Sequence, residues 1–143
     1  MFRKIDDKVY ASPQITLEQV AAAREMGIAL IVNNRPEGES DDQTDGVAIE
    51  AAARAAGIAY VAIPVTHAGF AEWQVAAMAD ALGQAQGPVL AYCRSGTRST
   101  LLWALAQATM GENPGVIAAK AAAAGYDIAP VRAVVDMLAA KQG

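Results

Sequence analysis

Hydrophobic and polar positions alternate along the chain in blocks that predict strands and helices in turn. Residues 28–32, 58–63 and 88–91 are almost continuously apolar, as expected of parallel strands that are buried on both faces. A shorter apolar run at residues 8–11 predicts one more strand. Polar loops and alanine-rich segments separate these runs, so the first two thirds of the chain predict a mainly parallel sheet with helices between its strands.

Local start and stop signals set the limits of the helices. Thr16 and Gln19 have capping-box spacing at the start of the first helix, and Gly27 ends it. A second helix is expected to end at Gly57, and a third is expected over residues 70–85. After residue 93 the pattern predicts helices alone, over residues 100–110, from Pro114 to a stop near residue 125, and from residue 130 onward. We therefore expect an α/β fold with a helical C-terminal third, formed by residues 1–143 as one domain.

Three polar loops follow the predicted buried strands, at residues 33–36, 64–67 and 93–98. In parallel sheets the ligand crevice lies at the carboxyl ends of the strands. If the strands are neighbours, the three loops share one rim. The arrangement predicts a functional site there.

The third loop carries the most distinctive chemistry, in the run Tyr92-Cys93-Arg94-Ser95-Gly96-Thr97-Arg98-Ser99. The sulfur of Cys93 would lie at a helix N-terminus beside two arginines, where an anion or a thiolate is stabilised. Gly96 lets the backbone turn so that its N–H groups converge on an oxyanion, and the Arg98 fork can bind two of the oxyanion's oxygens. We predict Cys93 and Arg98 as catalytic residues, with an outward-pointing Arg94.

The other residues of this loop are predicted to surround the bound anion. The predicted anion-binding residues are Arg94, Ser95, Gly96, Thr97 and Ser99. Ser99 could cap the helix or donate a hydrogen bond to the sulfur. Arg35, which ends an earlier strand, could bind substrate, lock the cysteine loop, or pair with the acidic residues that follow it.

The spacing within the loop resembles one enzyme class, and the rest of the chain resembles another. Four residues separate Cys93 from Arg98, as in rhodanese-type sulfurtransferases, whereas tyrosine and dual-specificity phosphatases have five and usually a histidine where Tyr92 stands. Four segments nevertheless match, in order, the phosphatase-like domain of bacterial "β-lactamase hydrolase-like" proteins: residues 9–16, 32–36, 63–65 and 90–99. This resemblance implies a dual-specificity-phosphatase-like fold, and members of the family are labelled both phosphatase-like and sulfurtransferase.

The reaction is harder to predict because the expected general acid is missing. A phosphatase of this kind usually carries an aspartate on the loop that precedes the cysteine strand, and residues 64–72 contain none. His67, the only histidine, is the candidate acid because imidazole exchanges protons near neutral pH, and Glu72 is a weaker one. Persulfide transfer needs no such acid. The sequence thus favours a sulfurtransferase that forms a Cys93 persulfide, with a phosphatase that forms a Cys93 phosphoenzyme as the alternative and a non-catalytic oxyanion-binding module as a third possibility.

Composition and charge limit the expected partners, cellular location and ligands of the chain. The chain has 143 residues, a net charge of −4 and a single cysteine. The negative charge argues against a nucleic-acid or anionic-membrane partner, and no apolar run reaches the about 18 residues of a membrane span. The lone cysteine and the charged N-terminus predict a reducing, cytoplasmic location.

The acidic cluster in residues 37–45 is interpreted as a solvated loop. We expect no metal and no cofactor, and a phosphate ester, thiosulfate or persulfide as substrate; the oligomeric state stays open.

Overall fold

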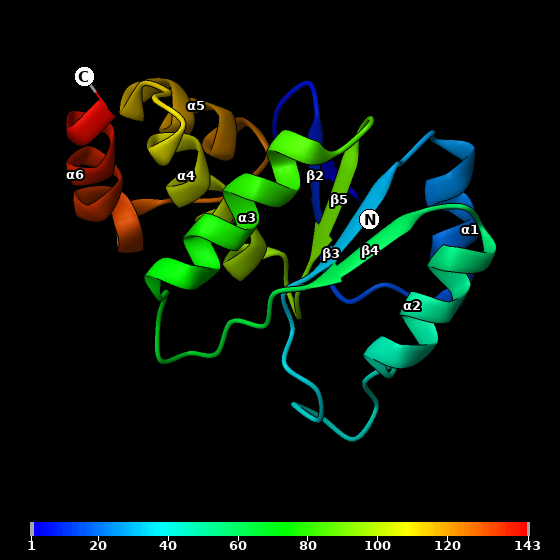
Figure 1. The fold of residues 1–143 in the computed structure, drawn as a ribbon. Coiled ribbons are helices and arrows are strands. Elements are labelled where there is room, and N and C mark those ends of the chain that lie inside the picture. The colour runs from blue at the N-terminus through cyan, green and yellow to red at the C-terminus, as the bar shows by residue number, and fades with distance from the viewer. Residues whose placement is uncertain (1, 143) are drawn as a thin grey trace.

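A five-stranded sheet places the strand that leads to Cys93 at its centre (Figure 1). The computed structural model describes residues 2–142. The order of the strands is β1-β2-β5-β3-β4; β1 is antiparallel to β2, and the other pairs are parallel. The strands are β1 (Arg3–Lys4), β2 (Val9–Ser12), β3 (Leu30–Asn33), β4 (Ala59–Ala62) and β5 (Val89–Tyr92).

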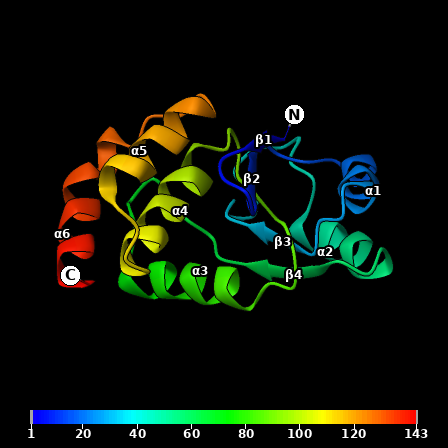
Figure 2. The same cartoon turned by 90° about the horizontal axis from the view of Figure 1, so that it is seen from above.

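Helices cover both faces of this sheet (Figure 2). The pair α1 (Leu17–Glu25) and α2 (Gly46–Ala55) lies on one side. The other side carries α3 (Glu72–Gln84), α4 (Thr97–Thr109), α5 (Pro114–Ala123) and α6 (Arg132–Gln142), with a short 3-10 helix, η1 (Ala129–Val131), before α6. The predicted α/β class, the mainly parallel sheet and the helical C-terminal third are confirmed.

Two hydrophobic clusters, one on each face, hold the sheet between the helix layers. Leu102 and Trp103 of α4 are buried in the larger cluster, together with Val32 and Ala91 of the sheet. Ile31 and Leu90 point the opposite way, into the smaller cluster beneath α1 and α2. Since neighbouring residues of β3 and of β5 enter opposite clusters, both faces of these strands are apolar, which explains why their sequences are continuously apolar rather than alternating.

Trp103 also ties α4 to the start of the chain. Its indole N–H donates to Asp6 Oδ2 at 3.0 Å. Asp6 Oδ1 accepts the backbone N–H groups of Lys8 at 2.8 Å and Val9 at 2.7 Å. One carboxylate therefore shapes the turn before β2 and satisfies the polar atom of a buried tryptophan.

Several element boundaries differ from the sequence prediction, with the largest of these shifts at the start of α4, and one strand was not predicted. Helix α4 begins at Thr97 rather than residue 100, because Gly96 takes φ 93° and turns the chain directly into the helix. The Thr100 hydroxyl then bonds back to the Gly96 carbonyl at 2.9 Å. Strand β1 was not predicted, since two exposed residues, Arg3 and Lys4, carry no hydrophobic pattern.

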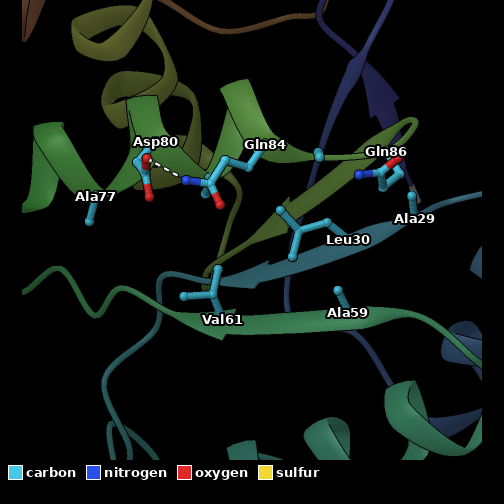
Figure 3. A pocket seen from close by; sticks show the side chains of 10 residues that line it. Ala29, Leu30, Ala59, Val61, Ala77, Asp80, Gln84 and Gln86 are labelled. Atoms are coloured by element: carbon cyan, nitrogen blue, oxygen red, sulfur yellow. Dashed lines mark hydrogen bonds between the residues drawn. The ribbon is translucent and has the colours of Figure 1, made fainter.

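A shallow groove runs along the outer part of the sheet beside α3 (Figure 3). Leu30 of β3 and Val61 of β4 line it from the sheet, and Ala77 and Asp80 line it from α3. Gln84 Nε2 donates to Asp80 Oδ1 at 2.8 Å across its wall. None of the side chains predicted to be functional lines this groove. Among residues 2–142, every helix is too short or too polar to cross a lipid bilayer.

Candidate active site

The loop after β5 turns around the sulfur of Cys93. Cys93 is fully buried, and the backbone N–H of Gly96 points at its Sγ, 3.1 Å away. Helix α4 starts one residue later, so its N-terminal dipole end faces the same atom. The strand–loop–helix arrangement predicted from sequence is therefore present, with a backbone donor already aimed at the sulfur.

Backbone hydrogen bonds from both neighbouring strands fix this loop. Cys93 N donates to the Ser12 carbonyl at 3.3 Å, and Gln14 N donates to the Arg94 carbonyl at 3.3 Å. On the other side, Asn34 N donates to the Tyr92 carbonyl at 2.8 Å. The central position of β5 thus gives the Cys93 loop support from β2 and from β3.

Arg98 lies in the first turn of α4 and is only 8% exposed. Its Nη1 donates to the Val65 carbonyl at 2.6 Å and to Glu39 Oε2 at 2.7 Å, and its Nη2 donates to Glu39 Oε1 at 2.9 Å. The hydrogen bonds that Arg98 donates to Glu39 are the main cause that raises the pKa of Arg98, and the proximity of Cys93 is a smaller one. The guanidinium therefore bridges the cysteine loop, the loop after β4 and the acidic loop after β3.

Glu39 joins Arg98 to the second arginine of the site, Arg35. Arg35 Nε donates to Glu39 Oε1 at 2.9 Å, and its other nitrogens reach Gln14 Oε1 and the Ser40 hydroxyl, each at 3.0 Å. The hydrogen bonds from Arg98 and then from Arg35 lower the pKa of Glu39 to about 2, against an opposing effect of burial. The carboxylate is thus ionised at neutral pH. Of the three roles left open for Arg35, the structure shows the pairing with the acidic loop.

Glu39 corrects one interpretation of the sequence. The acidic cluster was expected to be a solvated loop, but Glu39 turns inward, and its side chain is 18% exposed. Asp41 and Asp42 are exposed, and Asp42 accepts a hydrogen bond from the Ser40 hydroxyl at 2.6 Å. The sequence signal that could have identified Glu39 is its position four residues after Arg35. Five acidic residues share this loop, however, and nothing in the sequence excludes the other four.

Ser99 joins the site to the sheet rather than capping the helix. Its hydroxyl donates to Asn34 Oδ1 at 2.8 Å, and Asn34 Nδ2 donates to the Ile63 carbonyl at 2.9 Å. All three residues are buried. This chain of hydrogen bonds links α4 to the ends of β3 and β4. The cap position itself belongs to Gly96.

The remaining predicted loop residues face solvent. Arg94 is exposed, as expected, and so are Ser95 and Thr97. The Ser95 hydroxyl donates to Thr97 Oγ1 at 3.0 Å. Beneath the loop, the Tyr92 side chain is buried, and its hydroxyl has no hydrogen-bond partner among the described residues. Burial raises the pKa of Tyr92, so it remains a neutral support for the loop.

Both candidate acids lie between the end of β4 and the first turn of α3. His67 is exposed, on the loop whose Val65 carbonyl binds Arg98 two residues earlier. Glu72 is exposed at the first position of α3. Within residues 2–142, no group of three or more His, Cys, Asp or Glu side chains is arranged to hold a metal ion.

The sequence of the chain matches a known protein family. The model of the family described as "Beta-lactamase hydrolase-like protein, phosphatase-like domain" matches residues 1–110. A Beta-lactamase hydrolase-like protein of Xylella fastidiosa is 35% identical over 107 residues, which are 75% of this chain and 25% of that protein. The chain thus spans about a quarter of the length of the curated relatives it matches.

Solved structures agree on the architecture. A putative phosphatase from Neisseria meningitidis superposes with a TM-score of 0.83 at 35% identity, covering 95% of this chain and 96% of that one. PTPMT1 in complex with PI(5)P superposes with a TM-score of 0.74 at 13% identity, covering 99% of each chain, and this similarity concerns the fold alone. The fold is therefore similar to that of tyrosine and dual-specificity phosphatases. By its sequence match, the chain belongs to the family of the phosphatase-like domain of β-lactamase hydrolase-like proteins.

Proposed function

We propose that this chain is a cysteine-dependent phosphatase that hydrolyses phosphate esters. The observation that carries the proposal is the Cys93 loop, in which the Gly96 N–H points at a buried sulfur beside Arg98. The family match and the similarity to a putative phosphatase support phosphate as the bound group. They give no specific support to sulfur transfer, which the loop spacing and the missing aspartate had favoured.

The reaction would proceed in two steps at Cys93. The Cys93 thiolate attacks phosphorus, an S–P bond forms, and the bond from phosphorus to the ester oxygen breaks. The departing oxygen takes a proton from a general acid. Water then attacks the phosphoenzyme, breaks the S–P bond and releases inorganic phosphate. Arg98 and the loop N–H groups stabilise the charge on the phosphoryl oxygens throughout.

We assign the role of general acid to His67. Glu39 is the carboxyl group nearest to Arg98, but its lowered pKa of about 2 leaves it without a proton to give at neutral pH. The proposal is supported by the position of His67, two residues after Val65, whose carbonyl accepts a hydrogen bond from Arg98. Glu72, a weaker candidate, begins α3, the next helix.

Hydrolysis of an aryl phosphate tests the proposal. We expect the purified chain to release inorganic phosphate, and Cys93→Ser to abolish this activity. His67→Ala should lower kcat by about 10²-fold, whereas Glu72→Gln should change it little. An aryl phosphatase activity that survives in Cys93→Ser would show that Cys93 is not the nucleophile.

Sulfur transfer is the second candidate, because only four residues separate Cys93 from Arg98. In that case the Cys93 thiolate would take the outer sulfur of thiosulfate and release sulfite, and cyanide would then remove that sulfur as thiocyanate. Intact-protein mass spectrometry after incubation with thiosulfate, followed by a thiocyanate assay, separates the two reactions. A phosphatase is expected to give neither product.

A further inference from the structure

The peptide bond between Ser95 and Gly96 has its two polar groups engaged on opposite sides. Its N–H belongs to Gly96 and donates to Cys93 Sγ at 3.1 Å. Its carbonyl belongs to Ser95 and accepts from the Tyr126 hydroxyl at 3.4 Å. Because the N–H and C=O of a trans peptide point in opposite directions, rotating this one unit would replace the N–H beside the sulfur with a carbonyl oxygen. A carbonyl oxygen repels a thiolate and an oxyanion alike.

The backbone alone does not fix the direction of this peptide. Gly96 has φ 93°, a value that glycine adopts about as readily as a negative φ. The same freedom that lets the loop turn also lets the peptide rotate. A side chain that contacts this peptide can therefore hold its N–H towards Cys93.

Tyr126 is placed to supply that restraint. It follows α5 and precedes η1, outside the residues 1–110 that the family model matches. Its hydroxyl lies directly over Gly96, where any Cβ on that residue would collide with it. The Tyr126 side chain thus closes the outer side of the peptide while its O–H faces the Ser95 carbonyl.

Tyr126 is itself held in place from the other end of the chain. The Arg3 guanidinium lies 5.6 Å from the centroid of its ring, and Arg3 Nη1 donates to the Ala124 carbonyl at 3.0 Å. Burial, with Cys93 as a smaller cause and against the effect of Arg3, raises the pKa of Tyr126. The hydroxyl therefore keeps its proton at neutral pH and remains a donor.

We propose that Tyr126 is a positioning residue that locks the Ser95–Gly96 peptide with its N–H directed at Cys93. Its hydroxyl holds the carbonyl side of that peptide and thereby favours the thiolate on the opposite side. The inference deepens the proposed function, because it assumes that Cys93 works as a thiolate, and it applies equally to phosphate hydrolysis and to sulfur transfer. The charged and titratable groups that face Cys93 are Arg98 from α4 and Tyr126 from the segment after α5, with Glu39 behind Arg98.

The pH dependence of Cys93 alkylation tests the role of Tyr126 without any enzyme assay. The rate of reaction with iodoacetamide follows the thiolate fraction of the only cysteine in the chain. In Tyr126→Phe we expect the midpoint of this profile to move upward by roughly half to one pH unit. Tyr10→Phe is the matched control, because Tyr10 packs against the cluster on the opposite face of the sheet, and it should keep the wild-type midpoint.

A second readout reports the direction of the peptide itself. In the wild type, the ¹⁵N and amide proton shifts of Gly96 should follow the ionisation of Cys93, and this response should weaken in Tyr126→Phe. The inference is wrong if a folded Tyr126→Phe gives the wild-type alkylation profile and the wild-type Gly96 titration. This result is separate from the outcome of the phosphatase assay, since neither measurement involves turnover. If alkylation shifts but no phosphate ester is hydrolysed, Tyr126 keeps its role and the proposed function fails.

Discussion

Glu39 and Arg98 face each other as a two-pronged ion pair across 59 positions of the sequence, with nitrogen–oxygen distances of 2.7 and 2.9 Å. The pair joins the acidic loop to the first turn of α4. It occupies the end of the guanidinium fork, and Arg35 binds the same carboxylate from the other side. The negative charge of Glu39 therefore holds the positive charges of Arg98 and Arg35 together.

The first prediction concerns the pH dependence of stability. Glu39 has its pKa lowered from 4.5 to about 2 in the folded chain, so its ion pairs stabilise the fold above pH 4.5 and lose that contribution as the pH falls towards 2. We expect this contribution to be about 1–2 kcal/mol, because the solvent that reaches the pair screens it. Urea unfolding between pH 6 and pH 2.5 should show the loss in the wild type and a flatter profile in Glu39→Gln. Parallel profiles for the two proteins would contradict the assignment.

The second prediction concerns the shape of the Arg98 side chain. Arg98→Lys keeps the charge but replaces a planar fork with a single ammonium, which cannot hold both oxygens of Glu39 and also reach the anion. We expect kcat for an aryl phosphate to fall by on the order of 10²–10³-fold.

The matched control for this experiment is Arg94→Lys. Arg94 is exposed in the same loop, so its substitution should change kcat only a few-fold. Equal losses in the two variants would show that charge, rather than the fork of Arg98, is what matters.

The third prediction separates backbone strain from crowding. Gly96→Ala forces a Cβ into the position of the Tyr126 hydroxyl and also strains a φ of 93°, whereas Gly57→Ala strains a φ of 77° in open space. We expect Gly57→Ala to lower the free energy of unfolding by about 1 kcal/mol and Gly96→Ala to lower it by about 2–4 kcal/mol. Chemical denaturation of both variants measures the difference. If both variants lose the same amount, Tyr126 does not pack on Gly96.

The fourth prediction concerns Asp6, which accepts hydrogen bonds from Trp103 and from two backbone N–H groups. Asp6→Ala should lower the free energy of unfolding by about 1–3 kcal/mol, since it leaves a buried indole N–H without a partner. Asp7→Ala, at the neighbouring exposed position, should have little effect. Thermal unfolding of the two variants gives the comparison, and a near-equal stability would contradict the role of Asp6.

Much of the fold could be predicted because the relevant signals are local. The apolar runs identified β3 and β4, and Thr16 with Gln19 does form the capping box of α1. The prediction that three loops share one rim follows from strand order, and the contacts of Arg98 with Val65 and Glu39 show those loops together.

What could not be predicted depends on long-range contacts. The inward turn of Glu39 is decided by Arg98, which is far away in sequence, and the loop itself offers five similar acids. Tyr126 carries no motif at all, because its relation to Ser95 exists only after α5 has packed beside α4. The start of α4 at Thr97 depends on the conformation of Gly96, which a sequence pattern reports only as a possible turn.

The order of the strands has a consequence for how the chain folds. Strand β5 is the last strand in the sequence, yet it is inserted between β2 and β3, which both precede it by more than 50 residues. Until Val89–Tyr92 pairs with them, those two strands lack their shared neighbour, so completing the sheet requires slow, long-range pairing. The Cys93 loop is attached to this final strand. A chain in which the Cys93 loop has reached its folded position has therefore, by the same event, completed its sheet.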